Sequence, residues 1–389
     1  MTVEFADDVS YLTFLPISLI FVVICLVSLL KKKSKGVMAF DDGVFWNEHR
    51  LQRLKCSVKN YDWGKIGSDS EALSVAKTLS IQAHPCKELA KKLHIRDPLV
   101  YKDGNHKPEM ALAVTKFEIL CGFVSIEELQ RILKGVPEIS QLVGAAVVDQ
   151  LLNITPEDGE DTVKTALKQL FTQIMSASEH VIAEVLSQLI PRLRKKDELT
   201  SEEKLVLRLE KEYPGDVGVL AAFLMNYVTL NPGEALCLGA NELHAYVSGD
   251  CIECMATSDN VVRAGLTPKK RDVKTLCDML TYKLGRPDIL RGFNVEGTDG
   301  LTKRYRPPFE EFEVDHCDLP EGKSTKFPSM AGPSLFLVTE GTGIIKTAFS
   351  AEMVRVGDVL FAPANTKITI ESSGRRLQLY RAGVNSKFL

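Results

Sequence analysis

The stretch His244–Lys269 constrains the fold more than any other part of the chain, because it combines chemically active side chains with residues that interrupt helices. Its twenty-six residues include a histidine, several carboxylates, an arginine and a lysine, separated by glycines. Such a composition favours short strands joined by tight turns. We therefore expect a β structure that directs several polar side chains toward one cavity.

Two upstream clusters supply side chains of the same kind. Residues 80–85 read SIQAHP, and residues 101–109 read YKDGNHKPE. Because alternate residues of a strand point to the same face, Gln82 and His84 could reach one ion. Together with Glu109 and His244 they offer two imidazoles, a carboxylate and an amide oxygen, which is a suitable open site for Zn²⁺. The spacing leaves ordinary hydrogen-bonded histidines as the alternative.

These segments resemble the characteristic motifs of type I mannose-6-phosphate isomerases (phosphomannose isomerases). The resemblance rests on residues 80–85, 101–109 and the whole block 244–269. Weaker similarity covers residues 51–70, around the run NYDWGKIGSDSE, and residues 87 to about 301, with a faint continuation to the C-terminus. The long block is specific enough to identify the chain as a member of this family.

The resemblance implies an isomerase with one Zn²⁺ per chain that interconverts mannose 6-phosphate and fructose 6-phosphate and feeds GDP-mannose metabolism. The reaction moves a proton between C1 and C2 and develops negative charge on oxygen, so it needs proton-transfer groups and an electrophile. Arg263 matches the family's catalytic arginine. Lys107 and Asp259 are candidates for proton transfer, since burial can lower a lysine pKa toward neutrality. We expect phosphate contacts from Ser80 and Lys269, and zinc ligands at Gln82, His84, Glu109 and His244.

Other interpretations accompany these assignments. Structural salt bridges would explain Lys107, Asp259 and Lys269 nearly as well as catalytic roles would. A redox cupin such as a dioxygenase would place two or three histidines and a carboxylate around Fe(II), although the glutamine and the basic surroundings argue against it. A chain that only binds sugar phosphate, without turnover, is the third alternative. We expect a monomer.

One departure from the family lies just before the first cluster. Typical members place several strands between the Trp-Gly-Lys and Gln-x-His elements, one of them with an Ala-Glu-(Leu/Phe)-Trp-Met-Gly-Thr-His run. Here only nineteen positions separate Trp63 from Gln82, that run is absent, and Ala72 precedes Leu73 as though an internal exon were skipped. The loss should expose sheet edges and weaken stability or activity, although all proposed zinc ligands lie outside the gap.

Composition narrows the class of protein. A chain of 389 residues with 45% apolar and 25% charged residues fits two or three globular domains. The net charge of −3, without a basic stripe, argues against nucleic acid. Nine scattered cysteines suit reduced thiols in the cytosol. Cys251 and Cys254 lack the second pair that a zinc ribbon needs, so we expect them to pack as small apolar groups.

The N-terminus has a different character. Tyr11–Leu30 is twenty residues without a charge, which is long enough to span a bilayer as a helix. Acidic residues precede it and four lysines follow within residues 31–35, which predicts that the remainder faces the cytosol. A cleaved signal peptide is disfavoured because the basic flank is on the wrong side. A buried helix is the other alternative.

Helical patterns occupy the middle of the sequence. Capping boxes begin at Ser125 and Thr200, and an apolar stripe from Val163 to Leu189 predicts one helix that ends at Pro191. Val217–Leu230 is apolar on every side, which predicts a buried helix.

From about Pro308 the hydrophobic period is two, with turns expected at 341–343, 357–358 and 372–374. No histidine follows His316, so we expect this second barrel to hold no metal and to serve in packing. The expected fold is mainly β: a double cupin (jelly roll) with an inserted helical domain, preceded by a transmembrane helix. The expected domains are an anchor at 1–38, the catalytic barrel at 39–120 and 217–305, the helical domain at 121–216, and the second barrel at 306–389.

Overall fold

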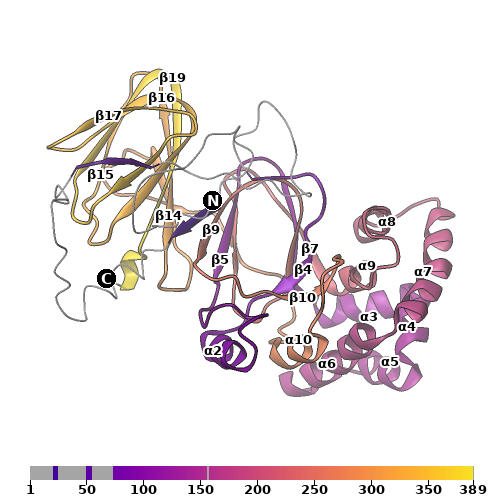
Figure 1. The fold of residues 1–389 in the computed structure, drawn as a ribbon. Helices are drawn as coiled ribbons and strands as arrows, with labels where there is room; N and C mark the ends of the chain where they lie inside the picture. Colours follow the sequence, from indigo (N-terminus) through magenta and orange to yellow (C-terminus); the bar gives the residue numbers. More distant parts are fainter. Residues whose placement is uncertain (1–20, 25–49, 55–72, 156, 389) are drawn as a thin grey trace.

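The computed structural model describes residues 21–24, 50–54, 73–155 and 157–388, and it shows two β-sheets with a helical region beside one of them (Figure 1). This arrangement confirms the expected mainly β architecture with a helical insertion. Most helices lie next to the sheet that is built from strands before residue 291, and the strands from residue 293 onward form the second sheet together with one strand at residues 52–54 (Figure 1). Residues 60–71, the run within the first region of weaker resemblance, lie outside the described residues.

Ten strands of the described chain form sheet 1. They are β1 (Phe21–Ile24), β3 (Leu73–Val75), β4 (Ile81–Ala83), β5 (Glu109–Ala113), β6 (Phe117–Phe123), β7 (Met225–Leu230), β8 (Ala235–Leu238), β9 (His244–Ala256), β10 (Val262–Gly265) and β11 (Ile289–Leu290). The long strand β9 connects them, because its first half pairs with β4 and β6 and its second half pairs with β1, β3 and β5. Two polar sequence clusters that lie far from β9 along the chain are thereby brought against it.

Nine strands of the described chain form sheet 2. They are β2 (Gln52–Leu54), β12 (Phe293–Asn294), β13 (Thr302–Tyr305), β14 (Glu313–Pro320), β15 (Ser324–Phe327), β16 (Ser334–Lys346), β17 (Ala351–Arg355), β18 (Val359–Ala362) and β19 (Ile368–Gly383). A turn does occur at Gly357, as expected, but residues 341–343 and 372–374 lie within β16 and β19 instead of forming turns. A Cβ atom at Gly341 would lie 1.7 Å from the main-chain oxygen of Arg376. This glycine therefore permits close approach of two strands at an irregularity in their pairing.

Most helices of the described chain follow one another along the sequence without an intervening strand. They are α2 (Lys87–Arg96), α3 (Ile126–Gly135), α4 (Pro137–Val143), α5 (Ala145–Leu152), α6 (Glu160–Ser176), α7 (Glu179–Arg194), α8 (Ser201–Glu212), α9 (Gly218–Ala221), α10 (Val273–Met279) and the 3₁₀ turns η1 (Ala222–Leu224) and η2 (Ser386–Phe388). The predicted capping box at Thr200 is confirmed. At Ser125 only half of the predicted box forms, because the Ser125 side chain accepts from the Glu128 N–H but the Glu128 carboxylate pairs with Arg131.

Two helix predictions were wrong. The stripe from Val163 to Leu189 forms α6 and α7 instead of one helix, because Ala177 is extended and Ser178 caps a new helix. Pro191 does not end α7 but lies in its last turn. In Val217–Leu230, only residues 218–224 are helical, and Met225–Leu230 is β7. Its antiparallel pairing with β6 overrides the local preference, which apolar composition alone could not reveal.

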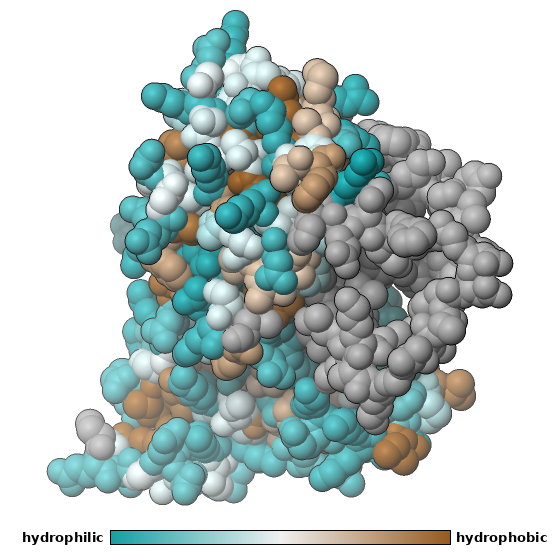
Figure 2. Space-filling model, turned by 90° about the vertical axis from the view of Figure 1, so that its left-hand side faces the viewer, coloured by the Kyte–Doolittle hydropathy of each residue, from teal (hydrophilic) through white to brown (hydrophobic). Residues whose placement is uncertain are grey.

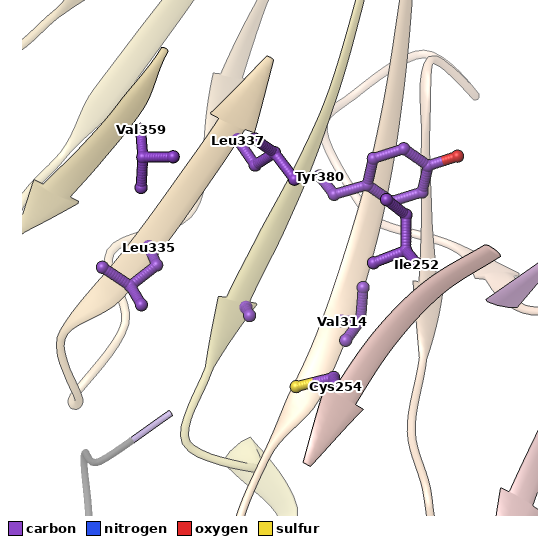
Figure 3. A pocket seen from close by; sticks show the side chains of 8 residues that line it. Ile252, Cys254, Val314, Leu335, Leu337, Val359 and Tyr380 are labelled. Carbon is purple, nitrogen blue, oxygen red and sulfur yellow. The ribbon is translucent and has the colours of Figure 1, made fainter. Parts of the chain in front are cut away.

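The two faces of β9 contact different surroundings. Ile252 and Cys254 point toward sheet 2, where they meet Val314, Leu337 and Tyr380 around a small apolar pocket (Figure 3). Cys251 lies on the other face and packs inside sheet 1. Both cysteines are buried, which confirms that they pack as apolar groups. Because residues three apart on a strand face opposite sides, the pair could not bind one metal.

The expected transmembrane segment, residues 11–30, lies mostly outside the described residues. Its described part, Phe21–Ile24, is strand β1, which pairs in parallel with residues 253–256 of β9. These four residues are therefore extended where we expected a helix. No helix in the described part of the chain has the length and apolar content that crossing a bilayer requires. On the face shown in Figure 2, hydrophilic side chains predominate and apolar ones occur in small groups.

Candidate metal centre

Three buried side chains from three strands of sheet 1 meet at one point. His84 follows β4 directly, Glu109 begins β5 and His244 begins β9. One potential ligand atom from each residue lies within 4.8 Å of those of the other two. The two oxygens of Glu109 are each approached by one imidazole, because His84 Nε2 lies 3.3 Å from Oε1 and His244 Nε2 lies 3.3 Å from Oε2. All three residues are at most 2% exposed, so water does not screen this cluster.

The hydrogen bonds of the two histidines direct their Nε2 atoms toward the centre. His84 Nδ1 donates to the main-chain oxygen of Asn260 at 2.6 Å, and His244 Nδ1 lies 3.2 Å from the main-chain oxygen of Glu242. A carbonyl oxygen can only accept, so Nδ1 carries the hydrogen and Nε2 keeps a free lone pair. His244 Nε2 is buried and makes no hydrogen bond to any described residue. Burying an unpaired polar nitrogen costs free energy unless a bound ligand supplies the missing partner.

The charge states of the cluster suit a divalent metal. Burial lowers the pKa of His84 below its ordinary value, although Glu109 opposes this shift. Burial would raise the pKa of Glu109, but Lys107 and His84 together hold it well below its ordinary range. The imidazole is therefore neutral and the carboxylate ionised, which are the forms that bind metals. Two imidazoles and a carboxylate match the ligand set of an open zinc site.

Gln82 lies on β4 opposite His244, beside the three buried residues. Its amide nitrogen is 3.5 Å from His84 Nε2, and its amide oxygen accepts from Ser80 Oγ at 3.2 Å. A half-turn of the amide would turn the oxygen toward the centre, and the NH₂ group could then donate to Ser80 Oγ. Gln82 and Ser80 are both half-buried. In this conformation Ser80, the predicted phosphate contact, binds the amide oxygen of the predicted fourth ligand, and the amide nitrogen faces His84 instead.

The pKa of Lys107 shifts in the direction opposite to the one that we expected. Its Nζ lies 3.0 Å from Glu109 Oε1 and its side chain is 15% exposed. Burial lowers the pKa of Lys107, but Glu109 and Glu253 raise it by more, so the net shift is upward. We expected burial to lower this pKa toward neutrality. Two buried carboxylates prevent that, because they stabilise the ammonium form.

The other predicted residues lie at the edge of the centre or outside it. Arg263, on β10, is paired in register with Gln82, and its half-buried side chain makes no ion pair or hydrogen bond within the described chain. Burial lowers the pKa of Arg263. Asp259 and Lys269 are exposed on loops, where the Asp259 main-chain N–H donates to Asp103 and that of Lys269 to Thr267.

Glu253 is a residue that sequence reasoning missed. It is 3% exposed and faces the interior of sheet 1, opposite Ala111 and therefore on the same face as Glu109. Tyr246 donates to its Oε1 at 2.6 Å, whereas its Oε2 has no hydrogen-bond partner among the described residues. Burial and the charge of Glu109 raise the pKa of Glu253 to about 8. The signal was an acidic residue within the otherwise apolar end of β9, residues 251–256.

Comparison with known families agrees with this centre. Three regions match models of type I phosphomannose isomerase: residues 71–126 its catalytic domain, 142–225 its helical insertion domain and 305–348 its C-terminal domain. Mannose-6-phosphate isomerase 2 of Arabidopsis thaliana is 58% identical over 82% of this chain and 72% of the relative. The chain belongs to the type I phosphomannose isomerase family.

Further members of the phosphomannose isomerase family resemble this chain in sequence or in fold. Mannose-6-phosphate isomerase 1 of Arabidopsis thaliana is 46% identical over 429 positions, which include 91% of this chain and 98% of the relative. That length exceeds the 389 residues of the whole chain, so the relative contains internal residues that this chain lacks. A crystal structure of a Salmonella typhimurium phosphomannose isomerase variant is 25% identical, with a TM-score of 0.69 over 81% of this chain and 77% of that one. A mannose 6-phosphate isomerase bound with zinc and yttrium has the same TM-score.

Proposed function

We propose that this chain is a zinc-dependent aldose–ketose isomerase that interconverts mannose 6-phosphate and fructose 6-phosphate. The observation that carries the proposal is the buried group of His84, Glu109 and His244, in which His244 Nε2 has no hydrogen-bond partner among the described residues. The curated relatives are named mannose-6-phosphate isomerases, which supports the same activity. One Zn²⁺ held by these residues and Gln82 would stabilise negative charge that develops on a substrate oxygen.

Proton transfer between C1 and C2 requires groups that can accept and return a proton beside the metal. We assign this role to Glu253, supported by Lys107, because both side chains face the interior near Glu109. The raised pKa of Glu253 allows its carboxyl group to exchange a proton near neutral pH. Asp259 is the alternative, although its exposed position offers less control over a proton.

Arg263 is assigned to the developing oxyanion or to positioning the sugar. A half-buried guanidinium without a protein partner in the described chain is available to a substrate anion. Ser80 and Lys269 remain the proposed phosphate contacts. The monomeric state, the domain boundaries, the cytosolic location of the catalytic region and the jelly-roll form of each sheet also remain predictions.

We also propose that part of sheet 1 is missing from this chain, between residues 63 and 82. β3 has only three residues and pairs with Gly249–Cys251, whereas residues 253–256 of β9 pair with β1 from the N-terminal segment. The additional internal residues of Arabidopsis mannose-6-phosphate isomerase 1 support a deletion. Because every proposed zinc ligand lies elsewhere, the deletion should weaken the fold more than the metal centre.

The isomerase assignment is tested by an assay that couples fructose 6-phosphate formation to a coloured product. The unaltered chain is compared with a variant into which the additional internal residues of the Arabidopsis relative are inserted. The metal content of both proteins is measured. We expect the variant with the inserted residues to bind zinc and to turn over substrate. The unaltered chain should show lower turnover or lower thermal stability. Sugar-phosphate binding without turnover in both would identify a binding protein, and bound iron would identify a redox enzyme.

We propose in addition that residues 11–30 hold the chain at a membrane, because their charge-free length and the lysines that follow predict an anchor. The pairing of β1 with β9 is a competing state of the same residues, since a strand within sheet 1 cannot also cross a bilayer.

Expression with and without residues 1–38 separates these states. We expect carbonate washing to leave the full-length chain in the membrane pellet, and protease added from the cytosolic side to digest its C-terminal region. Release by carbonate would show that β1 stays with sheet 1 and that no anchor forms. Protection from protease would show the reverse orientation.

A further inference from the structure

The main-chain oxygen that receives the hydrogen of His84 belongs to Asn260, in the loop between β9 and β10. This bond is 2.6 Å long, and both residues are 1% exposed. It decides which nitrogen of His84 carries a hydrogen. Without that acceptor, a neutral imidazole could adopt either tautomer, and one of them would place a hydrogen on Nε2, the nitrogen that faces the cluster.

The side chain of Asn260 holds this oxygen in place. Its Nδ2 donates to the main-chain oxygens of Asp103 at 2.7 Å and Asn105 at 3.1 Å, and it lies 3.2 Å from Asp103 Oδ1. These acceptors lie on the loop that leads into Glu109. The buried amide therefore connects the loop that orients His84 to the loop that presents the neighbouring carboxylate.

The carboxylate of Asp103 completes the connection. Its Oδ1 accepts from Ser258 Oγ and from the Asn105 N–H, each at 2.9 Å, and its Oδ2 accepts from the Asp259 N–H at 2.9 Å. Bonds to an ionised acceptor are stronger than bonds between neutral groups. A side chain that makes several of them fixes a loop firmly, although Asp103 contacts no proposed ligand directly.

We infer that Asp103 and Asn260 form a clamp that fixes the tautomer and position of His84 and thereby sets the metal affinity of the centre. The inference rests on the proposed zinc site. Both residues act through His84, so they are positioning residues. Partners of this kind behind a ligating histidine contribute about 10- to 100-fold in metal affinity.

The test replaces Asp103 by Asn in the full chain, which keeps the shape of the side chain but replaces one accepting oxygen with a donating NH₂ group. We expect the zinc dissociation constant, measured by competition with a coloured chelator, to rise about 10- to 100-fold. The visible spectrum of the Co²⁺-loaded variant should also change. The matched control is Thr115→Val, because the Thr115–Asp250 hydrogen bonds join β9 to the connection between β5 and β6 and involve neither Asp103 nor Asn260. This control should leave both readouts unchanged.

A second measurement does not depend on zinc, and its result for the unaltered chain does not depend on the variant folding. Nitrogen NMR of histidine-labelled, metal-free chain reports the tautomer of His84 directly, with the signal assigned by its loss in His84→Gln. We expect the hydrogen on Nδ1 in the unaltered chain and a mixture of tautomers in Asp103→Asn. A hydrogen on Nε2 in the unaltered chain, or unchanged affinity in a folded Asp103→Asn, would overturn the clamp. Absence of zinc binding by the unaltered chain would instead refute the proposed metal site.

Discussion

Replacing His84, Glu109 or His244 by Ala should abolish zinc binding, from one ion per chain to almost none. Each residue supplies one of the three buried donors, and no other group of three such donors occurs in the described chain to replace it. Loss of a direct ligand should cost more than the roughly 100-fold upper range for an indirect partner. Turnover should fall with the metal, because the electrophile is lost.

Elemental analysis of each purified variant checks this prediction. His180→Ala is the control, since His180 is exposed on α7 in the helical region. Thermal unfolding should show that the variants remain folded. Unchanged zinc content in all three ligand variants would refute the centre, whereas loss of zinc in the control would show that the preparation itself removes metal.

Replacing Arg263 by Ala should lower kcat by roughly 10²- to 10³-fold while changing KM little. The guanidinium is half-buried and has no ion-pair partner in the described chain, so its charge is available to an oxyanion. An interaction made mainly in the transition state affects kcat more than substrate binding. Steady-state kinetics of the zinc-loaded variant measures both constants.

Two further variants sharpen the assignment of Arg263. Arg263→Lys keeps the charge but loses the planar pair of donors, so it should recover only part of kcat. Arg355→Ala removes an exposed arginine from β17 in sheet 2 and should leave both constants unchanged. A rise in KM with constant kcat in Arg263→Ala would instead identify Arg263 as a phosphate clamp in the ground state.

Features that depend on neighbouring residues in the chain could be predicted from the sequence. The caps at Ser125 and Thr200 are local hydrogen bonds, and the spacing of Gln82 and His84 brings their side chains together at the end of β4. The N-terminal span is different, because its composition allows both a membrane helix and the described strand β1. The sequence of this span cannot decide between a membrane helix and a strand, because the choice depends on which other strands are available to pair with it.

The sequence alone determined the mainly β architecture and the family, and it supplied the proposed ligand types. Tertiary structure decided the rest, because the remaining properties depend on groups that are distant in the chain. Pairing with β6 made Met225–Leu230 a strand, and buried carboxylates raised the pKa of Lys107 against the effect of burial. The isolation of Glu253 from water and the bond from His84 to Asn260 likewise arise only when β9 and its loop pack against the first half of the chain.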